Sequence, residues 1–327
     1  MNCRKLGKTN WNISEVSLGA WQVGGKWGSD FDDQLAESII HSAIDNGVNF
    51  IDTADVYSDG LSEKAVARVV KSRSEQVWVA TKCGRQLNPH IAEAYNPANI
   101  TKFVDESLQN TGFEVLDLIQ LHCPPSEVYE KDEVFDALDE LKQIGKIKHY
   151  GVSVEKVSEA LRAIQRPGVA TVQIIFNMMR LKPAEDFFEA AKAANVGILA
   201  RVPLASGMLT GKFGKSTVFE AGDHRAFNRN GEAFDKGETF SGVNYDIALE
   251  AVKRYKAIFD SEELALYALK WILMFDAVSC VIPGASSINH VLSNVKASQL
   301  PDISDKAMQE VKDVYDALLR ADIHPQW

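Results

Sequence analysis

The chain has 327 residues, of which 46% are hydrophobic and 24% are charged, and its formal net charge is −10. This is the composition of an ordinary globular protein, and the length fits one large domain or two of medium size. Because the negative charge repels phosphate backbones and anionic lipids, we expect no nucleic-acid partner and no membrane-surface partner.

Strand-like and helical patterns alternate along the chain. Residues 3–16 predict a small β-hairpin whose turn is the sequence GKTN. Eight short runs of apolar and β-branched residues then predict strands, with polar turns and amphipathic segments between them. The eight runs are 15–21, 48–54, 77–82, 116–122, 147–153, 170–176, 196–204 and 277–285.

Helical signals fill the intervals between these runs. Apolar residues recur at helical spacing in 132–146, and 183–197 opens with a proline and closes on Gly197, which are start and stop signals. Two pieces lie outside the alternation: a Gly- and charge-rich insertion at 211–243, after the seventh strand, and a C-terminal helix at 305–321. A loop as long as the insertion is typical of a functional lid or of a disordered segment.

The alternation predicts an α/β fold, a closed eight-stranded (β/α)8 TIM barrel that forms one domain over residues 1–327. The main alternative is an open doubly wound sheet, which commonly announces a dinucleotide site by G-x-G-x-x-G after its first strand. Here the first strand leads into GAWQVGGKWG, whose glycines have a different spacing. The barrel is therefore the better prediction.

The cysteines and the apolar segments indicate a cytoplasmic protein. The four cysteines are widely spaced without a CxxC pair, and the first ten residues lack the apolar core of a signal peptide. The most apolar stretch, 264–285, is interrupted by Lys270 and Asp276, which argues against a membrane span.

In such barrels the chemistry lies at the carboxyl ends of the strands. Neighbouring strands lie about 4.8 Å apart, so Asp52 and Lys82 can form an ion pair with Tyr57 beside them. The lysine ammonium would lower the pKa of Tyr57 and make the phenol a proton donor and acceptor, while His122 could bind the same substrate oxygen. Each residue alone also has a structural explanation, such as a helix cap or a buried histidine, and Asp55 is predicted to be a turn or cap residue. The polar strand ends are Asp52 with Tyr57 in the next loop, Lys82, His122, Ser153, and Gln173 with Asn177.

Seven short motifs in order make the chain resemble the aldo-keto reductases over about residues 4–300. They are FIDTADVY…GLSE, ATK, LIQLH, GVS, VQIIFN, PLASGMLTGK and VIPGASS…N. The resemblance implies a (β/α)8 barrel that transfers hydride between NADP(H), less often NAD(H), and a carbonyl or alcohol. It implies that Tyr57 is the general acid, that Lys82 and Asp52 tune it, and that His122 orients the carbonyl.

The same resemblance implies the cofactor contacts. Ser153 and Gln173 would hold the nicotinamide carboxamide, and a helix beginning near Ser287 would favour an anion. The remaining contacts are Trp21 and Arg201 beside the nicotinamide, Leu204, Ser206, Gly207 and Lys212 at the pyrophosphate, and Gly284, Ser286, His290 and Asn294 at the adenosine end.

Three departures from the family pattern concern the cofactor. Val154 replaces a frequent asparagine, and Arg201 replaces an aromatic residue that often stacks on the nicotinamide. We expect the charge of Arg201 to favour the reduced cofactor. The stretch PGASSINHVLSN lacks the Lys and Arg that commonly pair the adenosine 2′-phosphate. NADP(H) is still favoured by the family pattern, with NAD(H) as the alternative.

A substrate pocket is expected around Tyr57 and His122, with Trp21, Trp27, His224 and Arg225 at its mouth. Two tryptophans suit a small polar or sugar-like carbonyl or alcohol, although aromatic residues there could equally be packing residues.

Two other functions compete with a reductase. The resemblance extends to potassium-channel β subunits, which serve as cofactor-binding regulatory partners. A metal-dependent hydrolase with Asp52, His122 and cysteine residues as ligands is disfavoured, because there is no HxH pair or second strand-end histidine to complete a site. No metal ligand set is predicted. No pattern in the sequence predicts an oligomeric state.

Overall fold

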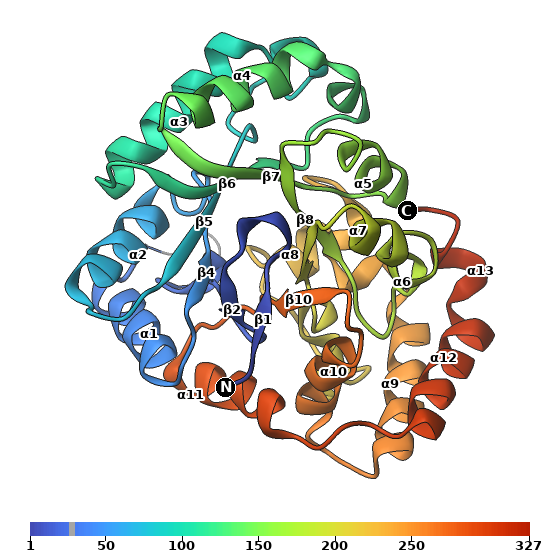
Figure 1. The fold of residues 1–327 in the computed structure, drawn as a ribbon. Coiled ribbons are helices and arrows are strands. Elements are labelled where there is room, and N and C mark those ends of the chain that lie inside the picture. The colour runs from blue at the N-terminus through green and yellow to red at the C-terminus, as the bar shows by residue number, and fades with distance from the viewer. Residues whose placement is uncertain (26–29) are drawn as a thin grey trace.

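The computed structural model describes residues 1–25 and 30–327. Within these residues, eight parallel strands form one sheet in the order β3 to β10 (Figure 1). Bridges from Val16 to Val281 and from Gly19 to Gly284 join its two edges and close the barrel, confirming the predicted (β/α)8 fold. The strands are β3 (Leu18–Gly19), β4 (Phe50–Asp52), β5 (Trp78–Cys83), β6 (Leu116–His122), β7 (Ile147–Ser153), β8 (Val169–Ile175), β9 (Gly197–Arg201) and β10 (Val278–Val281).

Helices surround the sheet and cover its outer face (Figure 1). They are α1 (Asp33–Asp45), α2 (Leu61–Ser72), α3 (Pro97–Thr111), α4 (Asp132–Gln143), α5 (Val157–Ala163), α6 (Lys182–Asp186), α7 (Phe188–Ala193), α8 (His224–Phe227), α9 (Tyr245–Phe259), α10 (Leu264–Leu273), α11 (Ile288–Val295), α12 (Asp305–Leu318) and α13 (Arg320–Ile323). Among the described residues, none of these helices is long and apolar enough to cross a membrane.

Two predicted helices are interrupted. The segment 183–197 forms α6 and α7, separated at Phe187, whose φ of −125° is not helical. Phe187 and Phe188 are both buried, and a continuous helix would point these neighbouring rings about 100° apart. Gly197 begins β9 instead of ending the helix. The segment 305–321 is likewise divided into α12 and α13 at Leu319.

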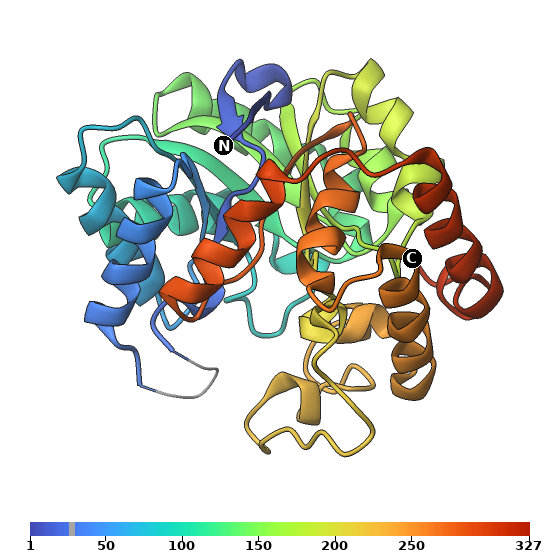
Figure 2. The ribbon, with the colours of Figure 1, turned by 90° about the horizontal axis from the view of Figure 1, so that it is seen from below.

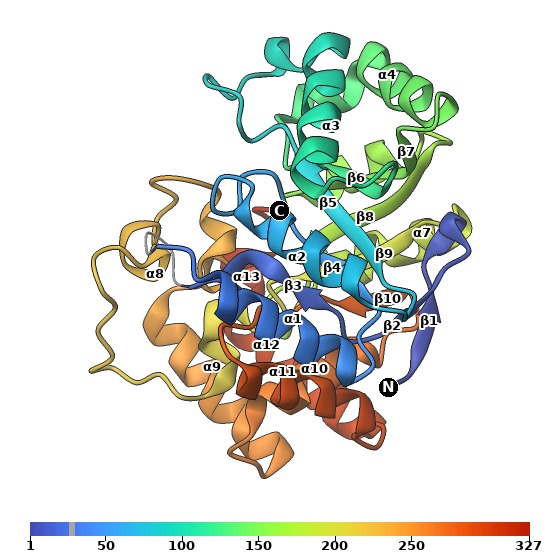
Figure 3. The same cartoon turned by 90° about the vertical axis from the view of Figure 1, so that its left-hand side faces the viewer.

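The predicted N-terminal hairpin is present and closes one end of the barrel. Its strands are β1 (Cys3–Lys5) and β2 (Asn12–Ser14), and the turn between them includes the 3₁₀ helix η1 (Gly7–Thr9). Figure 3 shows the hairpin at the opposite end of the barrel from α8. The amino ends of the strands are therefore covered, and the carboxyl ends face the insertion.

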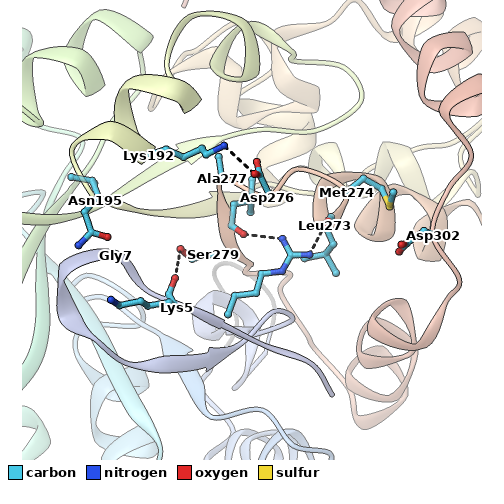
Figure 4. Close-up of a pocket in the computed structure, with 13 residues that line it drawn as sticks. Lys5, Gly7, Lys192, Asn195, Leu273, Met274, Asp276, Ala277, Ser279 and Asp302 are labelled. Atoms are coloured by element: carbon cyan, nitrogen blue, oxygen red, sulfur yellow. Dashed lines mark hydrogen bonds and ion pairs between the residues drawn. The ribbon is translucent and has the colours of Figure 1, made fainter.

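A cavity of about 640 Å³ lies beside this hairpin, where β9 and β10 begin (Figure 4). Arg4 donates to the carbonyls of Leu273, Phe275 and Val278 there and pairs with Glu15. The cavity walls include Lys5, Lys192, Ser279 and Asp302, and none of the predicted catalytic residues. The cavity is thus at the end of the barrel away from the predicted chemistry.

The insertion 211–243 extends beyond the carboxyl end of the barrel (Figure 2). It is partly helical: it contains α8 and the 3₁₀ helices η6 (Lys236–Glu238) and η7 (Phe240–Gly242). It follows η5 (Ala205–Thr210), the 3₁₀ helix that comes after β9.

Candidate active site

The barrel interior changes from apolar to polar along its axis. Near the hairpin, Phe50, Ala80 and Leu118 form one hydrophobic cluster with Leu199 and Leu6. Side chains two residues further along a strand point to the same face. That step leads from Phe50 to Asp52, from Ala80 to Lys82, from Leu118 to Gln120 and from Leu199 to Arg201. The strand period therefore carries these polar groups to the carboxyl end of the barrel.

Lys82 is the centre of a buried hydrogen-bond network. Its Nζ donates to Oδ2 of Asp52 at 2.5 Å, to the Thr53 carbonyl at 2.9 Å and to the Tyr57 hydroxyl at 3.1 Å. Asp52 Oδ1 also accepts from Nε2 of Gln120 at 3.2 Å and of Gln173 at 2.8 Å. Asp52, Lys82 and Tyr57 are thus brought together as the sequence predicted.

The pKa of Tyr57 differs from the sequence-based expectation. Burial raises it most strongly, and the opposing effect of the Lys82 ammonium is smaller, so the net pKa lies above 10. The expected lowering was wrong, because desolvation of the phenolate could not be read from the motif. Burial lowers the pKa of Lys82, but Asp52 and Tyr57 raise it more, so the lysine stays charged.

His122 lies beside Tyr57, with the two ring centroids 6.0 Å apart and the rings nearly perpendicular. Burial lowers its pKa well below 6.5, and the charges of Arg85 and Lys82 lower it further. The ring is therefore neutral at physiological pH and can donate one hydrogen bond. Its Nδ1 is buried with no hydrogen-bond partner among the described residues.

Next to His122 lies a group of four charged residues, Arg85, Glu155, Arg201 and Glu238, which we call the mouth cluster. Arg85 Nη2 lies 2.7 Å from Glu238 and 3.2 Å from Glu155. Arg201 lies 2.8 Å from Glu155 and 3.4 Å from Glu238, and it donates to the Val154 carbonyl at 3.0 Å. Two guanidinium groups thus face two carboxylates.

Protonation within the mouth cluster is uneven. Burial raises the pKa of Glu155, whereas the pKa of Glu238 is lowered because Arg85 and Arg201 outweigh its burial. Cys123 Sγ and one oxygen of each glutamate lie within 4.8 Å of one another. Such a group could hold a metal ion, but the arginines already occupy both carboxylates, so we interpret it as an ion-pair cluster.

The predicted pyrophosphate residues form a sharp turn after β9. Ala205, Ser206 and Gly207 have φ values of 47°, 55° and 90°, in the left-handed region. The Ser206 hydroxyl donates to the Glu238 carbonyl at 2.7 Å, and Leu204 precedes the turn. The side chain of Lys212 is exposed. A Cβ added at Gly207 would lie 3.1 Å from the Phe213 ring, so the turn favours glycine at this position.

The predicted adenosine residues gather at the start of α11. The helix begins next to Ser287 as expected, and the Ser287 side chain caps it. The Ser286 hydroxyl lies 3.3 Å from Nδ1 of His290, and Asn294 donates to the Gly284 carbonyl at 3.4 Å. The helix start beside Ser286 fits an anionic group. The buried Nδ1 of His122, which has no hydrogen-bond partner among the described residues, can bond a neutral polar group of a ligand. The residues present therefore fit a nicotinamide dinucleotide.

The other described residues predicted to contact the nicotinamide or the substrate lie around the barrel mouth and in the insertion. The Ser153 hydroxyl lies 3.4 Å from Cys123 Sγ. Trp21 packs against His224 with ring centroids 4.9 Å apart, which joins the loop after β3 to the insertion. Arg225 pairs with Asp223 at 2.5 Å and lies over Phe219, so its guanidinium is held within the insertion. Trp27 lies outside the described residues.

Asp55 lies in the turn that follows β4. It is buried, Oδ2 accepts from Nε2 of Gln86 at 3.0 Å, and Oδ1 has no hydrogen-bond partner among the described residues. Burial and the charge of Glu63 raise its pKa to about 7. Glu63 is itself held by Thr81 and Asn110. The predicted turn position is confirmed, whereas the burial of the carboxylate and its raised pKa were not predicted.

Sequence reasoning missed several residues of this site. Gln120 lies two positions before His122 on β6, Arg85 three positions after Lys82, and Glu155 two positions after Ser153. Polar residues at or just beyond strand ends were therefore a usable signal for all three. Glu238 lies in the insertion, where no pattern marks it.

Comparisons with known proteins identify similar sequences and folds. The model of the aldo/keto reductase family matches residues 15–316. The uncharacterized oxidoreductase YqkF of Bacillus subtilis is 28% identical over 325 residues, covering 97% of this chain and 99% of YqkF. The solved structure of the glycerol dehydrogenase AKR11B4 from Gluconobacter oxydans has 28% identity and a TM-score of 0.80, and the match covers 100% of this chain and 98% of that one.

Further relatives differ in what their names state. The aldo-keto reductase yakc [NADP(+)] of Schizosaccharomyces pombe is 25% identical and covers 96% of this chain and 91% of its own. The NADH-specific methylglyoxal reductase of Escherichia coli is 26% identical, covering 96% and 98%. A probable voltage-gated potassium channel subunit beta of Arabidopsis thaliana is 26% identical, covering 95% and 97%.

Proposed function

The chain belongs to the aldo/keto reductase family, and on this basis we propose that it transfers hydride between a nicotinamide cofactor and an aldehyde or ketone, or the corresponding alcohol. The observation that carries the proposal is the buried chain of contacts from Asp52 through Lys82 to the Tyr57 hydroxyl. It places a phenol, a cation that stabilises the phenolate and a carboxylate that holds the cation at the barrel mouth.

In reduction, Tyr57 donates its proton to the carbonyl oxygen and is left as a phenolate beside the Lys82 ammonium. A reduced nicotinamide held in this site would supply the hydride. Asp52 keeps Lys82 charged and in place, so the cation faces the oxygen on which charge develops. The neutral ring of His122 donates a hydrogen bond to the carbonyl oxygen and orients it. In alcohol oxidation, the Tyr57 phenolate accepts the proton.

For the cofactor we propose NADP(H), with NAD(H) as the alternative. Ser153 and Gln173 would hold the carboxamide, and since Gln173 Nε2 already donates to Asp52, its Oε1 is the atom left to accept. The Leu204–Gly207 turn with Lys212 would take the pyrophosphate, and the start of α11 the adenosine end. One relative is named as an NADP(+) enzyme and another as NADH-specific, so both cofactors occur among similar proteins.

The role expected for Arg201 needs revision. Its guanidinium would lie where an aromatic ring often stacks on the nicotinamide, but Glu155 and Glu238 compensate its charge. We therefore propose that Arg201 offers a flat surface to the ring, and that its charge favours the reduced cofactor only when this compensation is lost.

We propose a small polar carbonyl or alcohol as the substrate, bound near Trp21, Tyr57, His122 and His224. Charged and hydroxyl groups line this end of the barrel, and the names of similar proteins include a methylglyoxal reductase and a glycerol dehydrogenase. A cytoplasmic location remains a prediction from the sequence.

The test is turnover. NADPH and NADH oxidation is followed with a panel of small aldehydes, ketones and sugars, and alcohols are assayed with NADP⁺ and NAD⁺. Substrate-dependent turnover supports the proposal. Tight cofactor binding without turnover on any member of the panel would instead favour the regulatory role of the channel-subunit relatives.

A further inference from the structure

Trp327 is buried although it lies outside the barrel and far along the chain from the site. Its Nε1 donates to Oδ1 of Asp235 at 3.0 Å, and the Arg180 guanidinium lies 4.1 Å from its ring centroid. A Cβ added at Gly237 or at Gly242 would meet the indole ring. Figure 1 shows the C-terminal segment running from α13 to the side of the barrel where α5 and α6 lie. Trp327 therefore packs directly on residues 235–242 of the insertion.

Residues 235–242 carry Glu238 into the mouth cluster. Asp235 Oδ1 accepts from the Gly237 N–H at 2.7 Å, and the Asp235 carbonyl accepts from the Glu238 N–H at 3.0 Å. The turn that Trp327 fixes through Asp235 is thus the turn that presents Glu238. On the other side, the Ser206 hydroxyl holds the Glu238 carbonyl.

Arg180 joins the same residues from the barrel side. It follows β8, it is 2% exposed, and its Nη2 donates to the Glu155 carbonyl at 2.6 Å. One guanidinium therefore lies on the Trp327 ring and binds the backbone of the other glutamate of the mouth cluster. Trp327 and Arg180 touch none of Asp52, Tyr57, Lys82 or His122 in the described contacts, so any effect on chemistry passes through Glu155 and Glu238.

We infer that Trp327 and Arg180 are positioning residues that hold Glu238 against Arg85 and Arg201. In this position the Glu238 carboxylate neutralises the charge of Arg201, the guanidinium expected beside the nicotinamide. If Glu238 moves away, Arg85 and Arg201 share one carboxylate partner in place of two. The excess positive charge then repels the cationic oxidised nicotinamide and leaves the neutral reduced ring unaffected. The effect on cofactor binding rests on the proposed function, whereas the positioning of Glu238 does not.

The experiment compares wild type with Trp327→Ala, Trp327→Phe and Glu238→Gln. Hydrogen exchange read by mass spectrometry reports the backbone of 235–242, and fluorescence titration gives dissociation constants for NADP⁺ and NADPH. In Trp327→Ala we expect faster exchange in 235–242 and a rise of about fivefold or more in the ratio of the NADP⁺ to the NADPH dissociation constant. Glu238→Gln should raise the same ratio.

Trp327→Phe keeps an aromatic ring but loses the Nε1 donor and part of the indole's packing area, so it should give smaller changes in the same direction. It serves if Trp327→Ala does not fold. Tyr267→Ala is the matched control. Tyr267 lies on α10, away from the site, and its ring stacks on Phe259 with the ring centroids 4.8 Å apart. Its removal should change neither the exchange nor the ratio of dissociation constants.

Unchanged exchange in 235–242 overturns the inference, and so does faster exchange with an unchanged ratio. If wild type binds neither cofactor form, the proposed function fails, and the exchange data alone decide whether Trp327 positions Glu238.

Discussion

The Nζ of Lys82 lies 3.1 Å from the Tyr57 hydroxyl and 4.8 Å from the centroid of its ring. The ammonium therefore faces both the oxygen that loses the proton and the ring that shares the resulting charge. Burial opposes this and keeps the resting phenol protonated. Tyr57 thus holds its proton until a reaction makes its release favourable.

Tyr57→Phe removes this proton and little else. We expect carbonyl reduction to fall by about 10²–10⁴-fold, since that is the usual contribution of a positioned general acid. The dissociation constants of the cofactor, measured by fluorescence titration, should stay within about twofold of wild type, because a hydroxyl beside Lys82 is not a predicted cofactor contact. Turnover close to wild type would contradict the assigned mechanism.

The pH dependence of reduction follows from the same groups. The acid form of Tyr57 is required, and its pKa lies above 10, so kcat/KM should decline only at pH values above about 10. His122 is already neutral near pH 6.5 and should add no limb there. The profile is measured with wild type and His122→Gln, and a limb near pH 6.5 that vanishes in the variant would contradict this prediction.

Lys82→Met should be strongly destabilising. It leaves the Asp52 carboxylate buried without its cation, which typically costs about 3–5 kcal/mol. Replacing both partners in Asp52→Asn/Lys82→Met removes the uncompensated charge, so the double variant should be more stable than Lys82→Met alone. Urea unfolding of Lys82→Met, Asp52→Asn and the double variant measures this, and simple additivity of the two single changes would show that the pair is not coupled.

Asp55 makes stability depend on pH. Its folded pKa of about 7 lies above the unfolded value of about 3.9, so between these values the folded state holds a proton that the unfolded chain has lost. Stability from this group is present at low pH and falls as pH rises through that window. As pH rises from about 4 to 7, the free energy of unfolding of Asp55→Asn should therefore increase relative to that of wild type, by about 2–4 kcal/mol in total.

The Asp55→Asn measurement is thermal and urea unfolding across this pH range. Asp59→Asn is the matched control, because Asp59 is exposed in the same loop and has a φ of 51°, which asparagine tolerates. A stability difference for Asp55→Asn that does not change with pH would contradict the prediction.

His290→Arg should increase the preference for NADPH. His290 is exposed in the first turn of α11, where the adenosine 2′-phosphate is expected, and no Lys or Arg lies within residues 283–294. A guanidinium paired with a phosphate adds charge-assisted hydrogen bonds. We expect the ratio of kcat/KM for NADPH to that for NADH to rise by about tenfold, with kcat/KM for NADH little changed. An equal increase in kcat/KM for both cofactors would show that the adenosine 2′-phosphate does not bind at His290.

The barrel and the central residues of the site could be predicted because they depend on local patterns. The strands 116–122 and 147–153 have the predicted bounds, and the polar residues that end neighbouring strands meet as expected. Only the order of the strands and their spacing were needed to predict that Asp52, Tyr57 and Lys82 lie together.

The pairing within the mouth cluster could not be predicted in this way, although Arg85, Glu155 and Arg201 each lie at or just beyond a strand end. Arg85, Glu155, Arg201 and Glu238 come from four segments that meet only in the folded chain, and Glu238 lies in an insertion without periodicity. The direction of the Tyr57 pKa also depends on burial, which sequence spacing does not report. The break at Phe187 arises from the packing of two adjacent aromatic rings, which helix propensity does not include.

The seam of the barrel has a consequence for synthesis. Within the described residues, β4 to β9 pair with strands that are near in the chain, whereas Val16 and Ser17 pair with Val281. During translation the early strands therefore emerge long before the partner that covers their free edge. We expect the nascent chain to expose an unpaired β3 edge, a natural target for chaperones, until β10 leaves the ribosome.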